Sequence, residues 1–245
     1  MQLFKWKGKN REDNSALWFV GGLEGAAKAD SFILHLFQKA VTKGIFGPHP
    51  DLFLTPVGHP LSSDRKYNPG NGKPTDPALK GFPDSTDGSL PADACIENFT
   101  LSRWALHALP KALVTFSNGT SKIRYRNVGE DVVSKLSELA ERPAYPFGEE
   151  PEERADDGSL IPRQSIEHTL GAWLALKDVL WIDFSLSATL KNLDEVAVGE
   201  WKSFIGPALK WLVEGLRFAP LKEDEFLPKL EVIPALEMPP EFANL

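Results

Sequence analysis

The hydrophobic residues of the first quarter of this chain follow two spacings, one typical of β-strands and one typical of an amphipathic helix. The pattern predicts strands at 3–7, 17–20 and 51–55 and a helix over 29–41. Within the helical segment the apolar residues recur at i, i+3 and i+4, so one face should be buried, and Gly44 supplies the stop. We expect this helix to be a core element.

The second half of the chain shows both spacings again. It predicts a β-hairpin over 111–127, a helix over 130–141, a helix beginning at Pro162, a strand over 178–190 and a helix over 201–216. In the hairpin, Ser117–Thr120 forms the turn. In the last strand the alternation should place Asp183 on a solvent-facing side, because only the opposite side is apolar.

Strands and helices intermingle without the regular alternation of a doubly wound sheet. We therefore predict an α+β fold, with a mixed, largely antiparallel sheet packed against three to five helices. Residues 1–218 should form a single globular domain, with a long loop at 55–93 and an acidic loop at 148–159. The loop prediction rests on twelve Pro and Gly among 39 residues. Residues 219–245 hold five prolines and should form an extended tail.

Composition fixes the broad class of protein. Hydrophobic residues make up 42% of the 245, which is enough for a real core. No apolar run approaches the roughly 18 residues of a membrane span, and the first residues lack the apolar stretch of a signal peptide. The single cysteine, Cys95, cannot form an internal disulfide. We expect a cytoplasmic protein with no membrane partner.

Charge is concentrated in one segment. The net charge is −7, and residues 149–157 alone carry −5, which leaves the rest of the chain nearly neutral. The acids of this segment, predicted to bind a protein partner, are Glu149, Glu150, Glu152, Glu153, Asp156 and Asp157. A nucleic-acid partner is not indicated by such a balance.

Basic residues form a short row on one side of the predicted hairpin. Lys122, Arg124 and Arg126 occupy alternate positions and could bind an anion such as a phosphate. The alternative interpretation is a charged sheet edge that deters aggregation. The row could also meet the acidic segment of the same molecule.

One constellation points to metal chemistry. Asp183, followed by Glu200 and Lys202 in a Glu-x-Lys arrangement, resembles the metal-binding core of the PD-(D/E)xK nuclease superfamily. The resemblance covers about twenty residues and implies two carboxylates on a divalent ion, with a lysine that assists the attack of water. Asp183 departs from the pattern because no proline precedes it. A helix at 195–203 would direct Glu200 and Lys202 apart and remove the site.

Other candidate sites are weaker. His49 and Asp51, with His107 or His168, could form a two-histidine, one-carboxylate iron site, but such sites sit on β-barrels. Cys95 has no neighbouring base in the sequence and is expected to be inert.

Two functions remain. The first is an interaction protein, such as an inhibitor, an immunity protein or an assembly factor, that acts through the acidic and proline-rich segments without a cofactor. The alternative is a nuclease or phosphodiesterase built on the Asp183 constellation. Only this alternative requires a metal, Mg²⁺ or Mn²⁺.

Overall fold

The computed structural model describes residues 2–8, 16–23, 28–56, 58, 82, 96–118, 120–152, 169–186, 198–199 and 201–216. In these ranges it contains β1 (Phe4–Trp6), β2 (Ala16–Val20), α1 (Lys28–Thr42), β3 (Asp51–Thr55), α3 (Ile96–Ala108), β4 (Ala112–Asn118), β5 (Lys122–Arg126), α4 (Glu130–Ala140), β6 (Ala144–Pro146), α5 (Leu170–Ala175), β7 (Leu180–Leu186), the π-helical turn η2 (Trp201–Ile205) and α7 (Gly206–Gly215). No helix within the described ranges is long and apolar enough to cross a bilayer.

The strands form one mixed sheet in the order β1-β3-β2-β4-β7-β5-β6. Four of its six pairings are parallel and two are antiparallel. The prediction of a mixed sheet packed against helices is confirmed, but its largely antiparallel character is wrong. Parallel neighbours need long crossover connections. Here α1 lies in the connection from β2 to β3, and α3 lies in the connection from β3 to β4.

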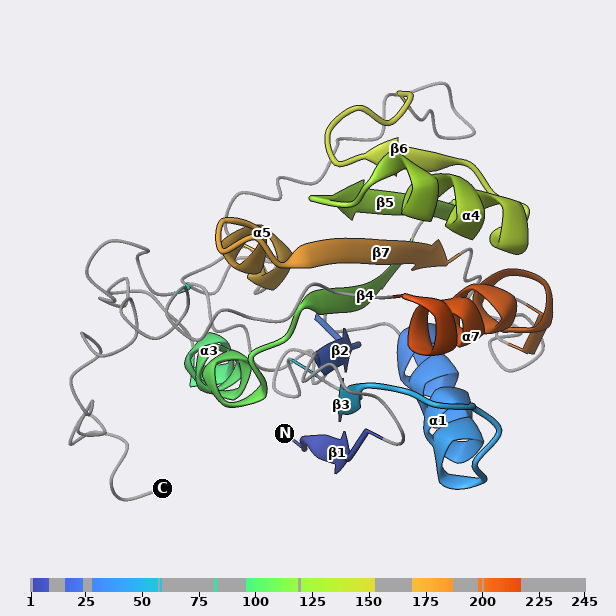
Figure 1. Ribbon diagram of the computed structural model, residues 1–245. Coiled ribbons are helices and arrows are strands. Elements are labelled where there is room, and N and C mark those ends of the chain that lie inside the picture. The colour runs from blue at the N-terminus through green and yellow to red at the C-terminus, as the bar shows by residue number, and fades with distance from the viewer. Residues whose placement is uncertain are drawn as a thin grey trace, which may run out of the picture.

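Helices cover both faces of the sheet (Figure 1). Residues of α1, α4 and α7 pack with one face in a single apolar cluster. Residues of α3 and α5 pack with the opposite face in a second cluster. The central strands are therefore buried on both sides, and all five residues of β2 are inaccessible to solvent.

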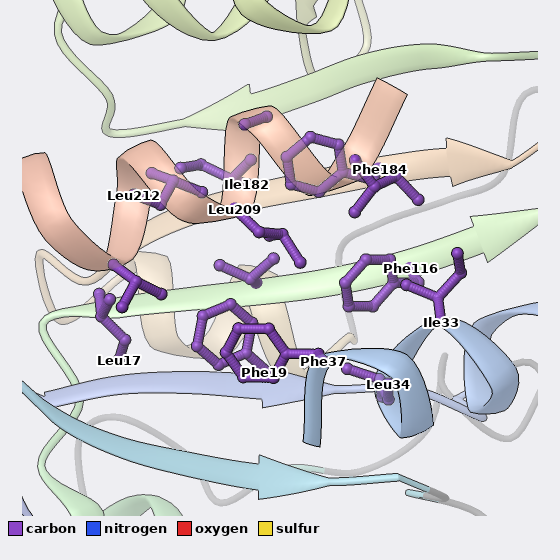
Figure 2. Packing of buried hydrophobic residues seen from close by; sticks show 14 of the residues in the cluster. Leu17, Phe19, Ile33, Leu34, Phe37, Phe116, Ile182, Phe184, Leu209 and Leu212 are labelled. Atoms are coloured by element: carbon purple, nitrogen blue, oxygen red, sulfur yellow. The ribbon is translucent and has the colours of Figure 1, made fainter. Parts of the chain in front are cut away.

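Aromatic side chains fill the first cluster (Figure 2). The ring of Phe19 lies 4.4 Å from that of Phe37 on α1, measured between centroids. Farther along the sheet, Phe184 lies 5.9 Å from Phe116 and 5.6 Å from Phe204. Such offset and edge-on arrangements are the favoured contacts between aromatic rings. They attach α1, η2 and three strands to one core.

The predicted hairpin at 111–127 is wrong, although both of its strands exist. β4 and β5 are separated by β7, which pairs in parallel with β4 and antiparallel with β5. Phe184 of β7 therefore stands between Phe116 and Ile123. The alternation of β4 and β5 correctly indicated the shared apolar face. No local pattern could show that β7, which begins 62 residues after the end of β4, would insert between them.

The prediction of a solvent-facing side for β7 is also wrong. Six of its seven residues are buried, and Asp183 is only 2% exposed. The polar side is covered because β7 is a central strand with helices on both faces of the sheet.

Helix α3 was not predicted from the sequence. Its buried side includes Asn98 and Ser102 together with Leu101, Ala105 and Ala108. The two polar residues interrupt the apolar stripe that would have revealed the helix. At the other end of the chain, the junction at Gly206–Pro207 marks where the π-helical turn η2 ends and α7 begins. Most of 55–93, the helix start at Pro162 and the tail at 219–245 lie outside the described residues.

Gly171 on α5 is expected to tolerate no side chain. A β-carbon at this position would lie 1.9 Å from Cε2 of Trp181, which is far inside van der Waals contact. We expect Gly171→Ala to lower the free energy of unfolding by roughly 3 kcal/mol, since the indole must shift within a packed layer. Urea unfolding followed by tryptophan fluorescence would measure the change.

Gly199→Ala provides the matched control. No atom lies within 4 Å of a β-carbon built at Gly199, so this substitution should change stability by less than about 0.5 kcal/mol. Equal effects of the two substitutions would show that α5 does not pack on Trp181 as described.

Candidate functional site at the carboxyl edge of the sheet

The topology of the sheet singles out one edge as the place for a site. After β2 the chain passes through α1 to β3 on one side, whereas β4 lies on the other side of β2 and the chain leaves it toward β5. Connections that diverge from two adjacent parallel strands leave a crevice at their carboxyl ends, where ligands of open α/β sheets bind. By this rule, the expected crevice of this sheet lies at the carboxyl ends of β2 and β4.

Polar side chains gather next to this crevice, on the face of the sheet that α3 and α5 cover. The pairing of β4, β7 and β5 places Thr115, Asp183 and Arg124 in one row across the sheet. In the next row toward the carboxyl edge, Ser117 stands beside Ser185. The four hydroxyl and carboxyl side chains of these two rows are all buried.

Asp183 is the centre of this polar cluster. Its Oδ1 accepts a hydrogen bond of 2.7 Å from the Thr115 hydroxyl. Its Oδ2 accepts from the Ser117 hydroxyl at 2.6 Å and from Nε and Nη2 of Arg124 at 3.0 and 2.7 Å. A carboxylate in a nearly dry sheet needs such donors, because burial of an unpaired charge costs several kcal/mol.

Arg124 reaches a second carboxylate as well. Its Nη1 lies 3.9 Å from Oε1 of Glu150, and the other oxygen of Glu150 accepts from the backbone N–H of Gly148 at 2.8 Å. The guanidinium carbon lies 5.1 Å from the ring centroid of Phe147, and that ring stacks on Trp181 at 3.8 Å. The turn after β6 thus encloses the charged cluster with an aromatic pair.

Of the nuclease-like constellation, the structure describes Asp183 and Lys202. Asp183 is paired with Arg124 in the sheet, and Lys202 is exposed on η2. Glu200 lies outside the described residues. The described residues near it, 198–199 and 201–205, are helical and do not form the strand that the constellation requires, and a nuclease is not supported.

Of the acidic segment, the structure describes Glu149, Glu150 and Glu152. Glu149 and Glu152 are exposed, whereas Glu150 is 7% exposed and faces Arg124. The remaining acids, Glu153, Asp156 and Asp157, lie outside the described residues. Of the basic row, Arg126 is exposed, Lys122 is half-buried, and Arg124 forms an ion pair with Asp183. The suggestion that the two segments meet within the molecule is confirmed for Arg124 and Glu150.

The two described histidine candidates, His49 and His107, lie away from the crevice. His49 is buried just before the amino end of β3, where its Nδ1 lies 2.7 Å from the carbonyl oxygen of Pro50. The Asp51 carboxylate accepts from the Gly8 N–H at 2.6 Å and lies 3.3 Å from Nζ of Lys5. His107 on α3 contacts the edge of Phe53. Cys95 and His168 lie outside the described residues.

The described side chains do not fit a metal ion. A catalytic zinc site takes three ligands from His, Cys, Asp and Glu. Within the described ranges no three such side chains lie close enough to hold an ion. The carboxylate nearest the crevice, Asp183, already accepts from Thr115, Ser117 and Arg124.

One signal in the sequence could have revealed this cluster. Thr115, Ser117, Arg124 and Asp183 each occupy the side of their strand that faces away from the aromatic core residues. Four polar positions of that kind on three strands indicate either solvent or a shared buried network. The opposite charges of Arg124 and Asp183 favour the network, but only the pairing of the strands decides it.

Comparisons with known proteins add the family of folds. No protein-family model and no curated protein sequence matches the chain. Among solved structures, a candidate metallopeptidase from Shewanella amazonensis has a TM-score of 0.59 at 12% identity, over 86% of this chain and 82% of its own. The murein-tripeptide amidase MpaA from Escherichia coli O157 has a TM-score of 0.53 at 13% identity, over 89% and 87%.

A third similar structure is an aspartoacylase family protein from Mesorhizobium loti. Its TM-score is 0.53 at 13% identity, over 89% of this chain and 62% of its own. At such low identity these likenesses show the fold alone. The prediction of an inhibitor, immunity protein or other interaction module is contradicted, because the solved structures that share this fold are named as a metallopeptidase, an amidase and an aspartoacylase family protein.

Thr115 is expected to stabilise the cluster through both of its hydrogen bonds. Its hydroxyl donates to Asp183 and accepts from the Trp181 indole N–H at 2.9 Å. Thr115→Val keeps the shape but leaves two buried polar groups without their partner, so the free energy of unfolding should fall by about 2 kcal/mol. Thr42→Val, at the exposed end of α1, should change it by less than about 0.5 kcal/mol. Chemical denaturation of both variants would show whether the loss is confined to Thr115.

Proposed function

We propose that this chain is a metal-dependent hydrolase that cleaves amide bonds in the crevice at the carboxyl ends of β2 and β4. The observation that carries the proposal is the order of the sheet, β1-β3-β2-β4-β7-β5-β6, with its divergent connections on either side of β2. A fold by itself does not define a reaction. The proposal therefore combines the position of the crevice with the type of reaction that the names of the similar structures denote.

The substrate class follows from the names of those structures. Peptidase and amidase both denote cleavage of an amide bond, and aspartoacylase denotes removal of an acyl group. Peptides and acylated amino acids are accordingly the substrates to supply.

Metal-dependent hydrolysis requires protein ligands for the metal ion. Because the described side chains do not form a complete ligand set, at least one ligand of the metal must come from residues outside the described ranges. His59 is the histidine to test first. It directly follows Gly58, whose N–H donates to the Gly21 carbonyl oxygen at 2.7 Å beside the end of β2. Imidazole is the commonest metal ligand in proteins.

Hydrolysis should be measured with purified protein, loaded with Zn²⁺ or stripped by a chelator. The substrates are a peptide with a free carboxyl terminus, the same peptide amidated, and an N-acetylated amino acid. We expect release of free amine from one of them with the Zn²⁺-loaded protein, and loss of that release after chelation. No turnover of any of the three by the Zn²⁺-loaded protein would overturn the proposal.

Two histidine variants test whether turnover and zinc binding depend on His59. His59→Ala should abolish the turnover and lower the bound zinc measured by mass spectrometry. His107→Ala should retain both, since His107 lies on α3 against Phe53, on the strand face rather than at the crevice. Full activity of His59→Ala would remove His59 as a ligand, and a zinc loss in both variants would point to unfolding.

A further inference from the structure

The buried charges of the sheet are not used by the proposed hydrolysis, and they suggest a role of their own. We propose that the Arg124 guanidinium is a permanent cation that stands between Asp183 and Glu150 where a bound metal ion would stand in a carboxylate site. It neutralises the two carboxylates, withholds them from metal and ties the turn after β6 to the centre of the sheet. This inference does not rest on the proposed hydrolase activity.

Both carboxylate oxygens of Asp183 already accept hydrogen bonds. A divalent ion would need to contact a carboxylate oxygen directly, at about 2.0–2.2 Å. Both oxygens of Asp183 instead accept from fixed donors at 2.6 to 3.0 Å, two hydroxyls and two guanidinium N–H groups. An entering ion would have to displace Arg124 from Asp183.

The planar shape of the Arg124 guanidinium also supports the proposal. Nε and Nη2 donate to Asp183, Nη2 also donates to Ser117 at 2.7 Å, and Nη1 faces Glu150. One planar group thus serves two carboxylates and a hydroxyl from three directions. A lysine ammonium is a point charge on a longer flexible stem and cannot reproduce this fork. The Phe147 ring beside the guanidinium favours a flat cation in the same way.

The cluster also joins three segments of the sheet region that are distant in the sequence. Arg124 is on β5, Asp183 is on β7 and Glu150 follows the turn after β6. β5 and β6 are the outermost strands on this side of the sheet, and β6 has only three residues. The ion pairs therefore attach a short sheet edge to a central strand with links that no chelator can remove.

A double-mutant cycle tests the pairing. Arg124→Met and Asp183→Asn should each lower the melting temperature by roughly 10 °C, because the first leaves Asp183 and Glu150 without their cation and the second removes one of the two carboxylates that face Arg124. The double variant should melt well above the temperature that adding the two losses predicts, since of the three charges only that of Glu150 remains. Additive losses would overturn the proposal.

Arg126→Met and Asp178→Asn form the control cycle. Both residues are exposed, so their effects should be small and additive. Should Asp183→Asn fail to fold, Glu150→Gln replaces it, and Arg124→Lys replaces Arg124→Met. Arg124→Lys is then expected to lose most of the stability despite keeping the charge, and full stability of this variant would contradict the role of the planar fork.

The response of the melting temperature to metal ions provides a second test. The shift of melting temperature caused by Zn²⁺, Mn²⁺ or a chelator should be the same in the unaltered chain and in Asp183→Asn or Glu150→Gln. A metal-induced rise that these variants lose would show that the carboxylates bind metal and would overturn the proposal. Absence of amide hydrolysis would refute the proposed function and leave these melting temperatures as they are, so the two failures are distinguishable.

Discussion

A buried carboxylate in the middle of the sheet is the constraint on which this arrangement depends. Asp183 lies on a strand covered by helices on both faces, where an unpaired charge would cost several kcal/mol. The cost is offset only if Thr115 and Ser117 of β4 and Arg124 of β5 stand on either side of it. β7 must therefore lie between β4 and β5.

The fold and the lining of this edge lead to different chemical expectations. The sheet is shared with proteins named for cleavage of peptide and amide bonds. The described part of the edge, however, carries hydroxyls and an internally paired aspartate rather than a set of metal ligands. Function resides in the site rather than in the fold, so the same sheet can carry either chemistry. The guanidinium of Arg124 supplies the positive charge that holds the acids of this region.

Charge composition alone was a poor guide to what the charged residues do. Asp183 suggested a metal ligand, Arg124 an anion-binding row and Glu150 a surface for a basic partner. The structure brings all three into one buried cluster. Residues 124, 150 and 183 are distant in sequence, and a formal charge count assigns all of them to the surface by default. The net charge of the acidic segment is consequently not the charge that a partner would meet.

The sequence by itself determined many of the regular elements and their apolar sides. The spacing of apolar residues located β2, α1, β3, α4 and β7 closely, because that spacing is a local consequence of helix and strand geometry. It did not find α3, whose buried side includes Asn98 and Ser102. The tertiary structure alone decided the strand order, the burial of Asp183 and the position of the crevice. Pairing between strands joins residues far apart in the chain, and no local pattern records which strand becomes the neighbour.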